Sequence, residues 1–229
     1  EVADIIFATL HSNQRVIQGR LVAGTRVIPL TIGAESLIRA EGVCREHYPL
    51  VEVRPFRNLK AGIIVTGSEV YQGRIQDRFS PVVRRKLAEY DCEILGQTLA
   101  SDQVELIVQG IQAFFSAGAD LITVTGGMSV DPDDVTPAGI RAAGGREVTY
   151  GVPMLPGAMF MLAYIGPVAV LGLPGCVMYY GASIFDVILP RVVAGDTMTR
   201  RDFVKLAHGG LCVHCRECTF PDCGFGKGA

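Results

Sequence analysis

The feature that most constrains the fold is an alternation of short apolar runs with helix-like segments between residues 60 and 195. Apolar runs of this length are typical of strands that are buried on both faces of a sheet. Such strands, when helices separate them, pair in parallel through right-handed crossovers. We therefore predict an α/β fold, a mostly parallel sheet with helices on both faces, with strands at residues 62–66, 92–99, 120–124, 159–164 and 167–171.

The segments between these runs carry helix start and stop signals. Ser80-Pro81 and Thr136-Pro137 each place proline at a first helical position, and Asp102 with Glu105 has the spacing of a capping box. These signals predict helices at residues 80–90 and 102–118 and a short helix after Thr136, and the apolar segment at residues 176–193 predicts a final helix.

Three zones follow from this pattern. Residues 1–59 contain short strand-like runs and a helix-like stretch at 35–41 that Gly42 should end. Residues 60–195 form the main α/β domain, and residues 196–229 form a tail with four cysteines. With 49% apolar and 19% charged residues, the chain has enough apolar side chains for a large core.

The charge balance excludes a general nucleic-acid binder, because the formal net charge is −2 and such proteins show a basic excess. We expect no membrane partner, since no apolar run reaches the ~18 residues that a bilayer requires. No secretory leader pattern is seen, so we expect a cytoplasmic protein. The chain opens with Glu1 and not Met, which fits a fragment or a processed chain.

Ligands of parallel sheets bind beyond the carboxyl ends of the strands, which here are three loops rich in glycine and hydroxyl groups. The loops comprise residues 66–69 with 73–77, residues 125–129 with 131–137, and residues 172–175. Glycine-rich backbone can direct its amides at an anion, and serine and threonine add neutral donors. Together the loops predict a cradle for a phosphate or another anionic group.

Two carboxylates in these loops, Asp77 and Asp134, could hold Mg²⁺ against such phosphates, because Mg²⁺ prefers oxygen ligands. Simpler interpretations stay open for each residue. Asp133 and Asp134 also suit a helix start, Asp77 also suits a turn, and Gly126-Gly127 alone also suits an ordinary turn.

The three loops together resemble the molybdenum-cofactor-biosynthesis (molybdopterin-binding) domain family, in family order and at family spacing. The similarity lies in residues 66–70 with 73–77, residues 125–130 with 134–137, and residues 173–175. It covers about residues 60–195 and implies molybdopterin, or its adenylated form, as the ligand. The segment at residues 19–57 is most similar to the one that precedes this domain in molybdopterin molybdenumtransferases.

The resemblance implies roles for individual residues. Asp134 would be the catalytic or metal-binding carboxylate, Glu69 and Asp77 would help to form the site, and the phosphate region would contact Gly126, Gly127 and Ser129. The loops would add these cofactor-binding residues: Thr66, Gly67, Ser68, Thr125, Thr136, Pro174 and Gly175. Three positions depart from the transferase pattern: Ser68 replaces an acid, Ala158 replaces a lysine, and Cys176-Val177 replaces Asn-Pro.

The tail contains the run Cys212-x2-Cys215-x2-Cys218-x4-Cys223. Thiolates at this spacing suit tetrahedral Zn²⁺, and the run is also close to that of iron–sulfur proteins. We predict a metal there, with zinc favoured. His214 lies within the run, but four cysteines already complete a tetrahedron.

These observations favour a transferase-like protein of molybdenum-cofactor biosynthesis that binds the pterin and inserts molybdate with Mg²⁺. The alternative is a non-catalytic module that senses, carries or delivers the cofactor to a molybdenum or tungsten enzyme. A homo-oligomer, dimer or trimer, is expected from the resemblance. An unrelated nucleotide-binding protein is disfavoured, because no phosphate-binding loop ending in Gly-Lys-Ser/Thr is present.

Overall fold

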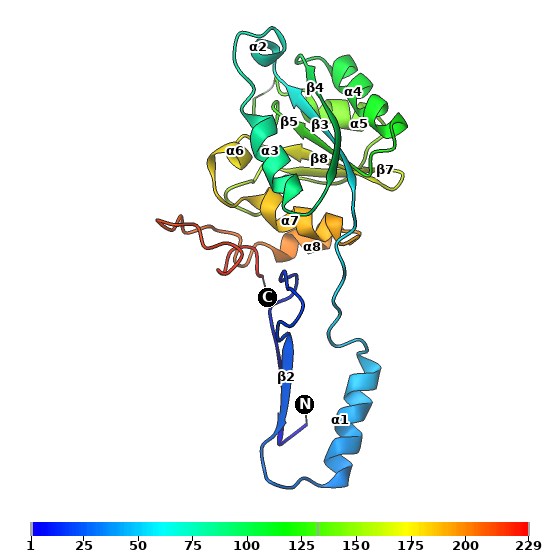
Figure 1. Cartoon of the computed structure of the whole chain (residues 1–229), viewed down its shortest axis with the longest axis vertical. Coiled ribbons are helices and arrows are strands. Elements are labelled where there is room, and N and C mark those ends of the chain that lie inside the picture. The colour runs from blue at the N-terminus through cyan, green and yellow to red at the C-terminus, as the bar shows by residue number, and fades with distance from the viewer. Residues whose placement is uncertain (1, 132, 229) are drawn as a thin grey trace. The chain divides into compact units, whose positions relative to one another are not determined.

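The computed structural model describes residues 2–131 and 133–228. It divides the chain into two compact units, Glu1–Pro55 and Phe56–Ala229 (Figure 1).

The N-terminal unit consists of a two-stranded antiparallel sheet and one helix. Strand β1 (Ile5–Thr9) pairs with β2 (Ala23–Val27), and helix α1 spans Ala34–Glu46. The helix continues through Gly42, where the sequence predicted its end. Glycine inside a helix costs only about 1 kcal/mol relative to alanine, so the neighbouring helix formers override it.

The second unit is built on a six-stranded sheet with the order β4-β3-β5-β8-β7-β6. Strands β4, β3, β5 and β8 run parallel, while β7 is antiparallel to β8 and to β6. The strands are β3 (Lys60–Thr66), β4 (Glu93–Ala100), β5 (Leu121–Thr125), β6 (Arg146–Tyr150), β7 (Met161–Ile165) and β8 (Val168–Leu173). The predicted mostly parallel α/β sheet is confirmed.

Helices cover both faces of this sheet, as Figure 1 shows. The longer ones are α3 (Phe79–Ala88), α4 (Val104–Ser116), α5 (Thr136–Ala142), α7 (Ile184–Val193) and α8 (Arg200–Lys205). Two short helices, α2 (Ser68–Tyr71) and α6 (Cys176–Tyr179), follow β3 and β8.

Each face of the sheet has its own apolar core. Along β3, Ile63 and Val65 join one cluster, whereas Ile64 joins the other. This division follows from the two-residue period of a strand, which sends neighbouring side chains to opposite faces. The first cluster includes side chains of α3 and α7, and the second includes side chains of α4 and α5.

The helix predicted at residues 176–193 is two helices, because residues 180–183 leave the helical path. Ser183 begins α7 with a capping box, in which its backbone amide donates to the Asp186 carboxylate at 2.7 Å. Helices α2 and α8 and strand β6 were not predicted. Each is short, and short elements give weak periodic signals.

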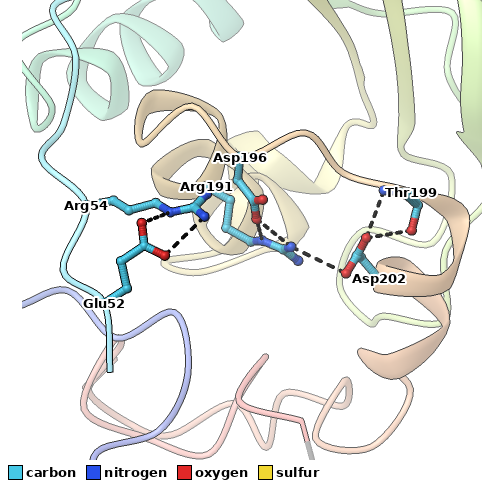
Figure 2. A network of polar contacts seen from close by, with 6 residues as sticks. All are labelled: Glu52, Arg54, Arg191, Asp196, Thr199 and Asp202. Atoms are coloured by element: carbon cyan, nitrogen blue, oxygen red, sulfur yellow. Dashed lines mark hydrogen bonds and ion pairs between the residues drawn. The ribbon is translucent and has the colours of Figure 1, made fainter. Parts of the chain in front are cut away.

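Helix α7 is joined to α8 by a polar network (Figure 2). Arg191 Nε donates to Asp196 at 2.8 Å, and an Arg191 guanidinium nitrogen lies 3.6 Å from Asp202. Asp202 also accepts hydrogen bonds from the backbone amide and the hydroxyl of Thr199, at 2.8 and 2.6 Å. The network therefore fixes the start of α8 against the end of α7. Within the N-terminal unit, the same figure shows Arg54 donating to Glu52 at 3.0 Å.

Among the described residues, none of the helices combines the length and the apolar content that crossing a bilayer requires.

Candidate functional site

The three loops singled out in the sequence follow β3, β5 and β8, which are neighbouring parallel strands. Their carboxyl ends therefore meet at one edge of the sheet, together with the end of β4. This is the edge at which parallel sheets bind ligands. The candidate site is formed by residues 66–69, 100–102, 125–131, 133–134 and 173–176.

Three threonines of the site hold the loops together from beneath. Thr66 Oγ1 donates to the Thr125 carbonyl at 3.1 Å and lies 3.2 Å from Thr136 Oγ1. The Thr136 hydroxyl donates in turn to the Gly126 carbonyl at 2.9 Å. All three threonines are buried. Their hydroxyls are thus engaged within the protein and support the loops. Their predicted role as ligand contacts stays a prediction.

Gly126 lies closely against β3. Its φ is +88°, and a Cβ there would come within 2.3 Å of the Thr66 carbonyl oxygen. Gly127, with φ of +53°, would place a Cβ 2.9 Å from Thr136 Oγ1. Glycine is required at both positions by the packing of the loop on Thr66 at the end of β3 and on Thr136 at the start of α5.

The backbone amides of Gly126, Gly127 and Met128 donate no hydrogen bond to any group within the described residues. Both glycines are partly exposed. Successive amides in left-handed and neighbouring conformations form a concave nest with a partial positive charge, which attracts anions. This loop can therefore bind a phosphate through main-chain groups alone.

Asp134 closes the same loop. One of its carboxylate oxygens accepts a short hydrogen bond from the Ser129 amide, and its own amide donates to the Asp131 carbonyl at 3.0 Å. The Tyr150 hydroxyl donates to the Ser129 carbonyl at 3.4 Å. Asp134 therefore ties Ser129 to Asp131 within this loop and is only partly exposed.

The first loop is fixed by Asp102, a residue that the sequence assigned to a helix cap. The Ser68 amide donates to the Asp102 carboxylate at 2.8 Å. Helix α4 starts instead after Gln103, without a side-chain cap, so the predicted capping box of Asp102 and Glu105 is wrong. The Asp102 carboxylate instead accepts a hydrogen bond from the loop that follows the neighbouring strand, β3. Local sequence spacing could not indicate this contact, because Ser68 and Asp102 are 34 residues apart.

Two hydroxyls beside this loop were also missed. Ser80, at the start of α3, and Ser101, directly after β4, are 2% and 7% exposed. Within the described residues neither Oγ has a hydrogen-bond partner. Unpartnered buried hydroxyls are uncommon in folded proteins, and these two are next to the edge where a ligand would bind.

The Asp77 carboxylate is fully engaged. One oxygen accepts from the Phe79 and Ser80 amides at 2.8 and 3.1 Å, and the other accepts from Gln97 Nε2 at 2.7 Å. Asp77 thus satisfies the first amides of α3, while Glu69 lies exposed on α2. Within the described ranges, no three histidine, cysteine, aspartate or glutamate side chains are gathered as metal ligands, so Asp134, Asp77 and Glu69 are not brought together.

The third loop is open at one residue. Pro174 is buried, but Gly175 is exposed, and a Cβ there would meet no atom within 4 Å. Cys176 follows, and burial raises the pKa of its thiol. Gly175 therefore leaves free space at the edge of the site.

The four cysteines of the tail all carry free thiols. Cys212 and Cys223 are partly buried against the first core cluster, whereas Cys215 and Cys218 are exposed. In the described part of the chain they do not form a ready metal site.

The sequence pattern of one protein family, described as "Probable molybdopterin binding domain", matches residues 62–194 of this chain. The match covers more than half of the 229 residues. The chain belongs to the molybdopterin-binding domain family. The resemblance read from the three loops is confirmed at this level.

Relatives of this molybdopterin-binding domain cover only part of the chain. A CinA-like protein of Mycobacterium sp. (strain JLS) is 38% identical over 89 residues, which are 39% of this chain and 21% of that protein. A CinA-like protein of Mycobacterium tuberculosis (strain H37Rv) is 35% identical over the same length. The match thus spans 21% of the length of these curated relatives.

Two solved structures share the fold of the domain. The protein CinA from Thermoplasma acidophilum, of unknown function, has a TM-score of 0.52 at 15% identity and covers 58% of this chain and 98% of its own. The tungsten cofactor synthesizing protein MoaB from Pyrococcus furiosus has a TM-score of 0.50 at 17% identity, with 60% and 96% covered. Similarity at this identity shows the fold alone.

Proposed function

We propose that this chain binds molybdopterin, or its adenylated form, and takes part in molybdenum-cofactor biosynthesis. The observation that carries the proposal is the run of amides at Gly126, Gly127 and Met128 that have no partner among the described residues. These amides would bind the phosphate of the pterin at the edge where β3, β5 and β8 end. Membership of the molybdopterin-binding family supports this ligand over other phosphates.

The other residues at the edge fit the same ligand. Ser129 is exposed beside the amide nest, and the buried hydroxyls of Ser80 and Ser101 lack partners within the described residues. The open surface at Gly175 leaves room for a bulky group. Neutral hydroxyls and main-chain amides can bind a phosphate by donating hydrogen bonds without a lysine, which fits the alanine at position 158.

Within this proposal, Asp134 would hold Mg²⁺ and support molybdate insertion. Its second carboxylate oxygen has no hydrogen-bond partner among the described residues. Mg²⁺ commonly uses one or two carboxylates together with phosphate oxygens and water, so a site without three gathered protein ligands is compatible with it. Glu69 is exposed and could add an oxygen, whereas Asp77 acts as a positioning residue for α3.

A second candidate is a module that carries or delivers the pterin to a molybdenum or tungsten enzyme without catalysis. The three hydrogen bonds that the Asp77 carboxylate accepts favour it, because they hold this carboxylate against α3 and Gln97 and leave it less acceptor capacity for a metal. The absence of a lysine at position 158 removes a point charge that could hold molybdate.

We also propose a cellular location and an oligomeric state for the protein. We place the protein in the cytoplasm as a homo-oligomer, dimer or trimer. Light scattering coupled to size-exclusion chromatography tests the oligomer, and a monomer would contradict that part.

Calorimetric titration of molybdopterin and adenylated molybdopterin, with and without Mg²⁺, tests the function. We expect Asp134→Ala to weaken binding about tenfold or more, because the loop loses a charge-assisted hydrogen bond of about 1.5–3 kcal/mol. Asp133→Ala, which removes an exposed acid next to it, is the matched control and should bind like the wild type.

Turnover separates the two candidates. Conversion of adenylated molybdopterin and molybdate by the wild type, lost in Asp134→Ala, supports the transferase. Tight binding without conversion supports the carrier, and absence of binding to the wild type contradicts both.

A further inference from the structure

The C-terminal loop, residues 209–226, contains the four thiols that the pterin site does not use. The thiols belong to Cys212, Cys215, Cys218 and Cys223, and all are free. Eighteen residues with four thiols form an unusually dense set of soft ligands, and soft thiolates select zinc, copper and iron–sulfur clusters over Mg²⁺.

The two ends of this loop are held together. The Gly226 amide donates to the Gly209 carbonyl at 2.9 Å. Phe225 is buried, and Gly226 lies so close to α7 that a Cβ there would be 2.6 Å from a methyl group of Val187. The loop therefore starts and finishes at one fixed base on the second unit, which limits how far its thiols can separate.

The loop is also seated along the body of the second unit at separate points. The Cys212 amide donates to the Leu155 carbonyl at 2.8 Å. The thiol of Cys218 lies 3.2 Å from the position that a Cβ on Gly181 would take, and the His214 ring lies 5.1 Å from the Tyr180 ring. Residues 180–181, which connect α6 to α7, thus contact the middle of the loop.

Between these points little holds the backbone. Within the described residues, the amides of residues 213–218 donate no hydrogen bond to another backbone group, and residues 213–219 are exposed. A segment that is anchored at its base, exposed in its middle and without a ladder of its own needs a cross-link to be fixed in one conformation.

We propose that this loop binds a metal through four thiolates, those of Cys212, Cys215, Cys218 and Cys223. Zinc is the expected ion, since four thiolates complete its tetrahedron at about 2.3 Å. An iron–sulfur cluster uses the same four-thiolate chemistry. The thiols are not gathered in the described structure, so metal binding would close the loop, as metal and folding are coupled in small thiolate sites.

Metal analysis of the full chain tests this site. The protein is purified without oxygen or chelator after expression with zinc and iron, and metal and sulfide are measured. We expect about one zinc atom per chain, or about four iron atoms with sulfide for a cluster. The Cys215→Ser and Cys218→Ser variants should retain less than about a tenth of this metal, because one thiolate is lost from a closed tetrahedron.

Cys44→Ser is the matched control, because Cys44 is an exposed thiol outside the loop. It should keep the full metal content. Less than about a tenth of a metal atom per chain in the wild type with all thiols reduced would overturn the proposal, as would equal loss in Cys44→Ser.

Closure of the loop has its own readout. Arg216 is exposed between Cys215 and Cys218, so trypsin can cut there. We expect the metal-loaded chain to be cut at least about tenfold more slowly than the chelator-treated chain, since local order protects a peptide bond. Equal rates would overturn closure. Neither readout involves the pterin, so failure here leaves the proposed function standing and the reverse also holds.

Discussion

Gly126 shows how tightly the amide nest is built into the fold. Its lack of a side chain lets the loop after β5 pass against the Thr66 carbonyl, and its positive φ is one that glycine adopts readily. The same residue thus serves the packing of the loop and belongs to the proposed phosphate-binding nest.

Gly126→Ala should destabilise the protein by about 2–4 kcal/mol, because the Cβ adds a steric clash to a left-handed backbone conformation. Urea unfolding followed by circular dichroism measures the change. Gly175→Ala is the control, since φ at Gly175 is −53° and no atom lies within 4 Å of its added Cβ. A stability loss of similar size in both variants would contradict the packing role.

The contrast between Asp77 and Asp134 shows what single residues reveal in a sequence. Both follow glycine-rich loops, and both were predicted as Mg²⁺ ligands. The structure commits both oxygens of Asp77 to α3 and Gln97, whereas Asp134 uses one oxygen on its own loop. Gln97 is 20 residues from Asp77, on the neighbouring strand, so no local pattern could have separated these roles.

At the scale of elements, a buried ion pair links α3 to α7. Lys86 on α3 contacts the Asp186 carboxylate and also donates to the Gly181 carbonyl at 3.3 Å. Its side chain is 4% exposed and that of Asp186 is 12% exposed. Because Asp186 also caps α7, the pair fixes the segment that leads away from the third loop of the site.

Lys86→Met should cost about 3–5 kcal/mol of unfolding free energy, because it leaves the Asp186 carboxylate buried without its cation. The double variant Lys86→Met/Asp186→Asn should recover part of that loss. A double-mutant cycle in guanidinium measures the coupling, and additive losses would show that the two side chains do not interact.

The network at the start of α8 gives an acid-dependent contribution to stability. Hydrogen bonds from the hydroxyl and the amide of Thr199 hold the pKa of Asp202 below its usual value, and Arg191 adds to this. A lowered folded-state pKa means that the contribution is present above the unfolded pKa of about 3.9 and is lost as pH falls through the lower, folded value.

Asp202→Asn should therefore cost about 1 kcal/mol near neutral pH, the usual worth of a helix cap, and should flatten the stability profile below pH of about 4. Thr199→Val, which removes the donor hydroxyl but keeps the carboxylate, should flatten it in part. Thermal unfolding across pH measures both, and an unchanged acid limb in Asp202→Asn would rule out this assignment.

Elements were predictable where the signal was local and repeated. The apolar runs located β3, β4, β5, β7 and β8, whereas Ser80-Pro81 placed the start of α3 two residues late, because the N-cap of this helix is Arg78. Gly42 did not end α1, which continues to Glu46 and has its C-cap at His47. Residues 180–183 were predicted as helix but are not helical, because Ser183 and Asp186 form the capping box of a new helix. The loop positions were predictable, but the pairing of Ser68 with Asp102 was not.

At the scale of the whole molecule, both apolar clusters lie in the second unit, and α1 of the first unit contains no buried residue. The first residues of the second unit are hydrogen-bonded to the end of α7. The Arg57 amide donates to the Val193 carbonyl at 3.0 Å, and its guanidinium donates to the Val192 carbonyl at 3.3 Å, at the end of α7.

A chain reduced to residues 56–229 should thus fold alone, with a Tm within about 4 °C of the full chain, because the buried core is intact. It should also keep its pterin affinity within about twofold, since a stability change of that size leaves the loops folded. Differential scanning calorimetry and titration of both chains provide the comparison. A fall in Tm well beyond this range would show that the N-terminal unit contributes to the core's stability.

The strand order has a consequence for how the protein is made. Strand β5 pairs with β3 on one side and with β8 on the other, and β8 lies 43 residues beyond the end of β5 in the chain. During synthesis on a ribosome, one backbone edge of β5 therefore stays unpaired until the β7–β8 hairpin has been made. An exposed strand edge invites pairing with other chains, so aggregation of truncated or slowly translated products would be centred on this edge.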